Sequence, residues 1–211
     1  MRPLRDTIPF DEALARTLAA ATPIDRTERV PLAAAHGRVL AETITAAADV
    51  PPFDRAAMDG FAVRAEDTVG ASAESPRTLC VVDTIYTGHA PSRPIDTGEC
   101  AEIATGAPLP PGANAVVMVE DTDRADGSPQ RPAVQILKPV KTGQNVGPRG
   151  ADIGRGDSLL GPGDHLTASR VGACAAIGRA EVEVYAQPSV AIVSTGGEIV
   201  PPGQPLGAAQ I

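Results

Sequence analysis

The spacing of apolar residues predicts two helices, one in each half of the chain. We expect the first over residues 10–20, where apolar positions recur three and four residues apart. Its predicted inner side consists of Phe10, Ala13, Leu14, Thr17 and Leu18. We expect the second over residues 167–177, capped by Thr167 and stopped by Gly178. Its predicted buried side consists of Val171, Cys174, Ala175 and Ile177.

Short runs rich in branched apolar residues, separated by turn residues, predict that most of the chain is β. Glycine and proline number 21 each, so the chain must turn often. Strands are expected at residues 28–32, 39–46, 78–84, 98–104, 115–120, 133–137, 181–185 and 189–194. The run 78–84 has the composition of a strand buried on both faces. Residues 123–132 are expected to form the polar tip of a hairpin.

The order of these elements predicts an insertion. Residues 46–140 form an all-β unit, and the flanks, 1–45 and 141–187, combine helix and strands in one discontinuous domain. Residues 188–211 contain an apolar run and a glycine-rich loop, which looks like a parallel strand that ends in a phosphate-binding loop. We therefore expect a mixed α+β fold, mainly β, with an inserted β domain. One strand cannot bury a parallel sheet, so we expect residues from about 187 onward to pack poorly, or the chain to be a fragment.

Charge and cysteine usage exclude several classes of protein. The chain has 18 basic and 26 acidic residues, a net charge of −8, and its basic residues are scattered, so we expect no nucleic-acid partner. No signal peptide or membrane-spanning run is evident, so we expect a cytoplasmic protein without a membrane partner. Cys80, Cys100 and Cys174 lack metal-site spacing and are expected to be small buried residues in a reducing compartment.

The stretch from Pro51 to Asp67 is the strongest candidate for chemistry. It contains two of the chain's few aromatic residues, Phe53 and Phe61, on either side of the acidic Asp59. We expect these rings to anchor the segment and leave the carboxylate exposed. The alternative is that Asp59-Gly60 forms an ordinary hairpin turn. His36, beside Gly37, is expected to be an exposed turn residue rather than a ligand.

Five sequence blocks in the same order resemble those of the molybdopterin molybdenumtransferase family. The first is Phe53-Asp54-Arg55-Ala56-Ala57-Met58-Asp59-Gly60-Phe61-Ala62-Val63. The others are Ala104-Thr105-Gly106-Ala107-Pro108-Leu109-Pro110, Gly143-Gln144-Asn145, Arg149-Gly150-Ala151-Asp152-Ile153, and Ser194-Thr195-Gly196-Gly197-Glu198-Ile199 with the following Pro202-Gly203-Gln204-Pro205-Leu206-Gly207. Each block is weak alone, but together they cover nearly the whole chain and are highly specific.

The resemblance implies a fold and an activity. The fold would be the family's elongated amino-terminal region with its inserted β domain, followed by the first strand of a truncated molybdopterin-binding α/β domain. The activity would be Mg²⁺-dependent insertion of molybdate into adenylylated molybdopterin, with release of AMP. The resemblance further implies a homodimer in which the inserted unit closes over the partner's α/β domain. Molybdopterin adenylyltransferase and molybdoenzyme maturation proteins are possible partners.

The resemblance also implies site residues. Asp59, Thr105 and Glu198 would be catalytic, and Asp59 and Glu198 would bind the metal. Anion-binding residues would be Gly106, Arg149, Thr195 and Gly196. A hydroxyl and a turn amide at 105–106 suit an oxyanion, and a glycine pair after an apolar run suits a phosphate, although ordinary turns are the alternative for both.

Three departures from the family pattern leave a second function open. Gly197 stands where the family usually has Asp, and Ala151 stands where it tends to have Glu. Arg149 is the one arginine left of a run, and its alternative role is a surface salt bridge to Asp152 or Asp157. The alternative function is a non-catalytic dimerisation or scaffold module. If the chain is part of an enzyme, we expect it to hold half a site and to show little or no turnover alone.

Overall fold

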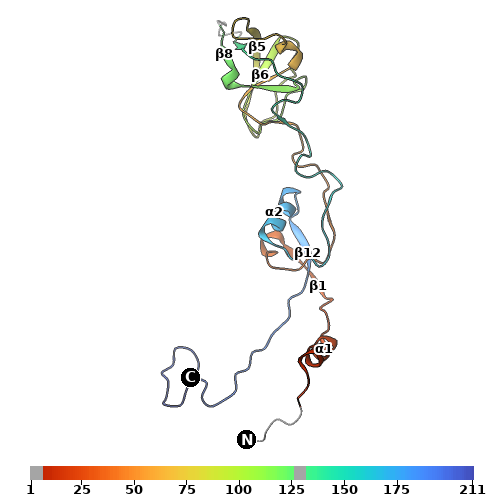
Figure 1. Ribbon diagram of the computed structural model, residues 1–211, viewed down its shortest axis with the longest axis vertical. Coiled ribbons are helices and arrows are strands. Elements are labelled where there is room, and N and C mark those ends of the chain that lie inside the picture. Colours follow the sequence, from red (N-terminus) through yellow and green to blue (C-terminus); the bar gives the residue numbers. More distant parts are fainter. Residues whose placement is uncertain (1–6, 126–131) are drawn as a thin grey trace.

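A computed structural model describes residues 7–125 and 132–211 and shows an elongated molecule (Figure 1). A β-rich upper part carries the strands labelled β5, β6 and β8, and a lower part carries α2, β1 and β12 (Figure 1). Helix α1 and the carboxyl-terminal segment extend away below the lower part (Figure 1). The predicted division at residues 45/46, 140/141 and 187/188 stays a prediction.

The described elements are short, as the turn-rich composition predicts. The helices are α1 (Phe10–Ala20), α2 (Ala168–Ala176) and the 3-10 turns η1 (Leu32–Ala34), η2 (Ala65–Thr68) and η3 (Val119–Asp121). The strands are β1 (Thr27–Pro31), β2 (Ile44–Thr45), β3 (Arg55–Ala56), β4 (Gly60–Val63), β5 (Arg77–Ile85), β6 (Glu99–Ile103), β7 (Ala115–Met118), β8 (Thr122–Arg124), β9 (Ala133–Ile136), β10 (Val146–Gly147), β11 (Ser158–Leu160) and β12 (Glu181–Tyr185).

The upper part is built on a six-stranded sheet in the order β7-β4-β6-β5-β9-β8. All neighbours are antiparallel except β5 and β6, which are parallel. Successive side chains point to opposite faces, and the sheet has a core on each. One core includes Val63, Leu79, Cys100, Val117 and Ile136, and the other includes Ala62, Ile85, Ile95, Ile103 and Val116. These two cores fix the strands that lead to the candidate site.

Strand β5 is not buried on both faces, so that prediction is wrong. Only Leu79 and Ile85 are buried within it, and Thr84 is exposed. Strand β9 pairs with Arg77–Cys80 alone, which leaves the later half of β5 without a neighbour on that side. The predicted hairpin tip at 123–132 lies mostly outside the described residues, although β8 and β9 pair as a hairpin would.

The lower part packs helix α2 against two small antiparallel pairs, β1 with β12 and β2 with β11. The hydroxyl of Thr167 accepts a hydrogen bond from the Arg170 amide at 3.4 Å, and Gly178 has a φ of +80°, so both predicted helix ends are confirmed. Cys174 is buried, but Ala175 is exposed, contrary to prediction. Ala175 lies about 100° around the helix from Cys174, because an α-helix has about 3.6 residues per turn.

Residues 39–46 form a two-residue strand and isolated bridges rather than the one strand predicted. Their backbone partners come from different segments: the Leu40 amide donates to Asp164, and the Ala41 amide donates to Glu183. A continuous ladder needs a single neighbouring strand. The chain then rises to the upper part beside residues 146–157, and Val50 and Ile153 form a bridge between these two connecting segments.

Both ends of the described chain lack a buried core. Helix α1 forms as predicted, but none of its side chains is buried, and Phe10 is 78% exposed. Residues 189–194 form no strand, contrary to prediction, and Ile192 is 92% exposed. The expected poor packing after residue 187 is confirmed by these exposures. None of the described helices is both long and apolar enough to cross a bilayer.

Candidate functional site

Asp59 lies on the surface at a bend between β3 and β4, as predicted. Its Oδ1 atom accepts two hydrogen bonds from Thr105, one from the backbone amide at 2.6 Å and one from the hydroxyl at 2.8 Å. The hydrogen bond from the Thr105 amide and, to a lesser extent, the one from its hydroxyl lower the pKa of Asp59 below its ordinary value. The carboxylate is therefore a fixed, exposed anion at neutral pH.

Gly60 is required by the close approach of a neighbouring strand, not by a turn. It lies in β4 between β6 and β7, and a Cβ atom there would lie 1.9 Å from the carbonyl oxygen of Val117. Strand β3 pairs with β10 and not with β4, so the hairpin alternative for Asp59-Gly60 is wrong. Phe61 packs against a sheet core and anchors the segment, whereas Phe53 is 41% exposed and does not anchor it as predicted.

A cavity of about 250 Å³ opens beside Asp59 on the sheet. It lies where the parallel strands β5 and β6 both end, which is the edge at which parallel strands commonly present ligand sites. Its walls include Asp59, Phe61, Thr84, Tyr86, Glu102 and Val119. An exposed carboxylate thus borders a hollow that is large enough for part of a small molecule.

The turn at 105–106 holds Asp59 in place. Both donors of Thr105 go to Asp59, and the Gly106 amide donates to the carbonyl of Ala56 at 2.8 Å. Gly106 has a φ of +82°, which favours glycine at this turn. In this conformation, these groups position the carboxylate and already have partners within the chain. Their predicted role as donors to an oxyanion stays a prediction.

Arg149 lies in the connection between the two parts, with its side chain paired to Asp49. Its backbone amide donates to Asp54 at 2.7 Å. Asp152 instead faces Arg55 at 3.5 Å, so neither partner predicted for the surface salt bridge of Arg149 is the one found. The hydrogen bonds from the Arg155 amide and the Arg149 side chain lower the pKa of Asp49.

Asp49 was missed by sequence reasoning. It binds Arg149 and the Arg155 amide, and so it ties together two segments about a hundred residues apart. A separation that long leaves no signal in local spacing.

The other predicted site residues lie in the carboxyl-terminal segment. Thr195, Gly196 and Glu198 are exposed, and the Ile211 amide donates to the carbonyl of Glu198 at 2.7 Å. This segment lies at the opposite end of the molecule from the six-stranded sheet (Figure 1). The structure therefore does not bring Asp59 and Glu198 together within one chain. Across residues 7–125 and 132–211, no three His, Cys, Asp or Glu side chains form a metal-binding group.

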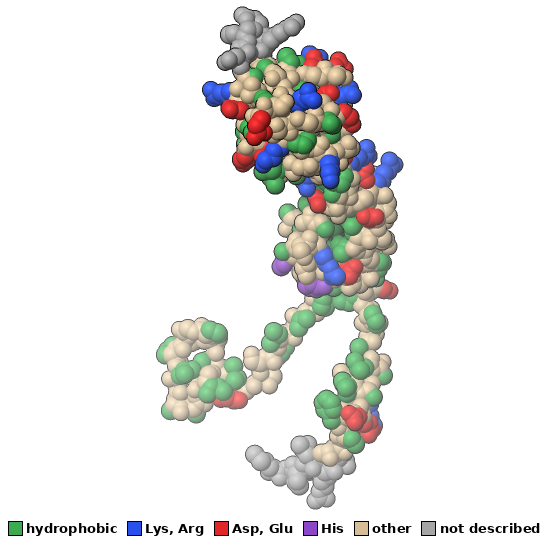
Figure 2. Space-filling view, turned by 45° about the horizontal axis from the view of Figure 1, so that its top comes forward, with side chains coloured by type: hydrophobic (Ala, Val, Ile, Leu, Met, Phe, Trp, Pro, Cys, Tyr) green, Lys and Arg blue, Asp and Glu red, His purple; other side chains and the backbone are tan. Residues whose placement is uncertain are grey.

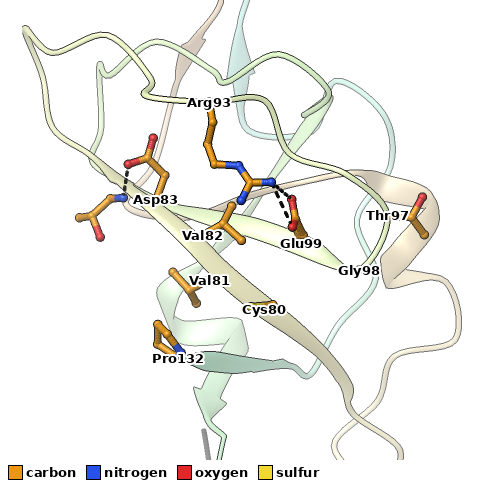
Figure 3. A pocket seen from close by; sticks show the side chains of 10 residues that line it. Cys80, Val81, Val82, Asp83, Arg93, Thr97, Gly98, Glu99 and Pro132 are labelled. Atoms are coloured by element: carbon orange, nitrogen blue, oxygen red, sulfur yellow. Dashed lines mark hydrogen bonds and ion pairs between the residues drawn. The ribbon is translucent and has the colours of Figure 1, made fainter. Parts of the chain in front are cut away.

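A second cavity, of about 780 Å³, lies beside β5 (Figure 3). Two of its charged groups are paired: Arg93 reaches both oxygens of Glu99, at 2.9 and 3.2 Å (Figure 3). Desolvation raises the pKa of Asp83, but hydrogen bonds from Ser92 and Thr84 outweigh it and lower the pKa overall. Acidic and basic side chains also alternate over the upper part in Figure 2. Asp59, which no cation neutralises among the described contacts, is the better candidate for chemistry.

A family model described as "MoeA N-terminal region (domain I and II)" matches residues 8–178. The chain is 37% identical over 208 residues to Molybdopterin molybdenumtransferase 2 of Mycobacterium tuberculosis, covering 99% of this chain and 49% of that protein. It is 37% identical over 207 residues to the Bacillus subtilis molybdopterin molybdenumtransferase, covering 98% of this chain and 48% of that protein. The chain thus spans about half the length of these curated relatives.

Solved structures give the same relationship. A molybdopterin biosynthesis MoeA protein from Pyrococcus horikoshii OT3 is 38% identical, with a TM-score of 0.81, over 94% of this chain and 52% of that one. Another structure described as a Pyrococcus MoeA protein is 40% identical, with a TM-score of 0.76, over 98% of this chain and 51% of that one. The sequence matches and the structural matches each cover nearly all of this chain and about half of the matched protein.

Proposed function

The chain belongs to the MoeA N-terminal family, and from this premise we propose that it takes part in molybdenum cofactor biosynthesis, as part of a molybdopterin molybdenumtransferase. The proposed reaction is the insertion of molybdate into adenylylated molybdopterin with release of AMP. Molybdate is here a substrate and not a resident metal. The names of the relatives support the role in cofactor biosynthesis, and the geometry of this chain supports Asp59 as the candidate catalytic residue.

The observation that carries the proposal is the pairing of Asp59 with Thr105. Both donors of Thr105 go to one carboxylate oxygen, Oδ1, and hold the side chain at the rim of the cavity. A fixed anion of this kind is suited to hold a cation or orient a water next to an oxyanion. We propose that Asp59 is the catalytic group and that Thr105 positions it.

A Mg²⁺ ion fits here only with help from the substrate. Mg²⁺ is usually held by one or two carboxylates together with phosphates and waters. Asp59 can supply one carboxylate, and within the described part of the chain it belongs to no group of three or more His, Cys, Asp or Glu residues that could hold a metal. When bound, the ion would neutralise charge on the phosphate and the oxyanion. The residues of this chain would orient that assembly rather than enclose it.

The second proposed metal ligand, Glu198, and the anion-binding residues Thr195 and Gly196 would then act in another copy of the chain. Asp59 directly precedes β4 of the six-stranded sheet, and Glu198 belongs to the carboxyl-terminal segment, which lies at the other end of the molecule (Figure 1). A homodimer that places the sheet of one subunit over the carboxyl-terminal region of its partner would reunite them. We propose that dimer as the working form, and we expect the 211-residue chain alone to show little or no turnover.

A non-catalytic scaffold of the same family is the second candidate. Gly197 and Ala151 replace acidic residues of the family pattern, and the two proposed metal ligands are far apart in one chain. These observations favour a role in assembly. The exposed carboxylate of Asp59 favours chemistry, because a scaffold does not require an anion held at a cavity rim.

Deleting the gene in the source organism tests the pathway. We expect molybdenum-dependent enzymes to lose activity and adenylylated molybdopterin to accumulate, because the step that consumes it is absent. Restoring the gene should reverse both effects. Normal cofactor content in the deletion strain would contradict the proposed function. If the deletion removes the cofactor and a gene variant without the Asp59 carboxylate restores it, the scaffold role is favoured.

A further inference from the structure

The cavity beside Asp59 contains side chains that the proposed chemistry does not use. Phe61 pairs with Glu102, and Glu102 pairs with Thr84, so these three residues form one cross-strand row on the sheet. Two residues further along, Tyr86 follows β5 and Asp59 precedes β4 on the same face, because side chains alternate along a strand. Both rows line the cavity.

The cavity exists because a core stops at Phe61. On this face, Val63, Cys100 and Val117 are buried, and Phe61 is half-buried against them. Beyond Phe61, Tyr86 is 61% exposed and Val119 is 51% exposed. Two aromatic rings and a valine therefore border open space next to polar groups. Such a mixture of apolar walls and a few polar groups is typical of small-molecule sites.

The charge of the cavity selects the part of a ligand that can enter. Among the described residues, Asp59 and Glu102 line it, and no lysine or arginine does. The Thr84 hydroxyl lies 3.5 Å from Glu102, too long for a strong hydrogen bond, so the Glu102 carboxylate can accept from a ligand. Phosphate or molybdate would meet only negative charge there, whereas N–H groups would find acceptors.

The size of the cavity limits the ligand to a ring system. Its volume of about 250 Å³ falls below the roughly 300 to 1,000 Å³ of pockets that enclose drug-sized molecules. A flat heteroaromatic ring system would place its faces against the apolar walls and its edge toward Glu102. A complete nucleotide would need more room and cationic partners for its phosphate.

We propose that this cavity binds a planar, amino-substituted heteroaromatic ring, with Glu102 accepting hydrogen bonds from its N–H edge and Tyr86 packing on its face. The identity of the ring rests on the proposed function: it is the pterin of the substrate. Glu102 and Tyr86 are then positioning residues. They hold the ring so that the anionic part of the substrate lies outside the cavity, at the side where Asp59 is exposed.

Amide chemical shifts in the full 211-residue chain test this proposal, with neopterin, a neutral pterin, as the probe. We expect saturable shifts centred on Phe61, Thr84, Tyr86, Glu102 and Val119. Glu102→Gln should weaken binding about tenfold, the usual scale for a hydrogen bond to a charged group. Tyr86→Ala should weaken it about three- to tenfold, whereas Tyr86→Phe, which keeps the ring, should bind within about twofold of the natural chain.

Two control substitutions lie outside the lining of the cavity: Glu120 follows the lining residue Val119, and Val69 lies near Arg77, at the other end of β5. Glu120→Gln removes a charge one residue after Val119, and Val69→Ala removes an apolar side chain that is 65% exposed. Neither should alter neopterin binding. Shifts that stay absent, or that appear at the cavity beside β5 instead, would overturn the ring site, as would equal affinities in Glu102→Gln and the natural chain.

The outcome is separable from that of the proposed function. If the gene deletion removes the cofactor but neopterin does not bind at these residues, the ring site alone is wrong. If neopterin binding depends on Glu102 but the deletion leaves the cofactor intact, the ring site stands as a binding site and its link to cofactor synthesis is wrong.

Discussion

The six-stranded sheet and the two ends of the chain have similar apolar patterns, but the apolar side chains are buried in the sheet and exposed at the ends. In the sheet, Ile103 and Val117 are buried in the cores on its two faces. In the ends, Leu18 of α1 and Ile192 of the carboxyl-terminal segment are 64% and 92% exposed. Apolar periodicity therefore predicts which local conformation a segment favours, but burial also needs a facing surface. The sheet supplies that surface to itself, and the described residues supply none to the ends.

Truncating an apolar side chain in each region should give the largest difference in stability between the two regions. Ile103→Ala should lower the free energy of unfolding by about 2 to 5 kcal/mol, because it leaves a cavity in a packed core. Ile192→Ala should change it by less than about 0.5 kcal/mol, because this side chain is already exposed. Urea unfolding followed by circular dichroism measures both. Equal losses would show that the carboxyl-terminal segment is packed in solution.

Adding a single methyl group should sharpen the contrast inside the sheet. Gly60→Ala should lower the free energy of unfolding by about 1 to 3 kcal/mol, because its Cβ would strike the Val117 carbonyl. The matched control is Gly172→Ala in α2, where nothing lies within 4 Å of the new Cβ. It should gain about 0.5 to 1 kcal/mol from helix propensity. A stable Gly60→Ala protein would mean that β4 and β7 are not so close.

Acid should lower the free energy of unfolding of the upper part and its connecting segments, by less than the core substitutions do. The folded-state pKa values of Asp49, Asp59 and Asp83 are lowered from 3.8. Their stabilising contribution is therefore complete above the unfolded value and is lost as pH falls through the lower folded values. We expect the unfolding free energy to decrease as the pH falls below about 4, because protonation then removes these hydrogen-bonded charges.

Replacing the connecting carboxylate should flatten that dependence. Asp49→Asn removes the titratable charge that pairs with Arg149 and keeps only one of the two acceptor oxygens, so the stability of this variant should change less with acid than that of the natural chain. Asp25→Asn, in the exposed segment between α1 and β1, should keep the original slope. Parallel slopes for Asp49→Asn and the natural chain would exclude Asp49 as a source of the acid sensitivity.

Local sequence was sufficient for much of the fold. The caps at Thr167 and Gly178 and the positions of β5, β6, β7 and β9 could be predicted, because their signals lie within a few residues. The burial of β5, the short pairing of residues 39–46 and the absence of a strand at 189–194 could not. Each depends on which distant segment lies alongside, and that is decided by tertiary packing.

The candidate site shows the same limit. The exposure of Asp59 could be predicted from the aromatic residues beside it. The reason for Gly60 could not, because the clash with Val117 arises from a strand more than fifty residues away. Glu102 and Tyr86 gave no signal either. They reach the cavity only because β5 and β6 are parallel and end together.

Replacing Asp59 in the organism tests the central claim most directly. Asp59→Asn in the chromosomal gene keeps the shape of the side chain and removes its charge, and Asp123→Asn changes an exposed carboxylate on β8 of the same sheet. Molybdenum cofactor content should fall to that of the deletion strain in the first variant and stay normal in the second, with both proteins present at equal levels. Normal cofactor content in the Asp59→Asn strain would contradict a catalytic role for this carboxylate.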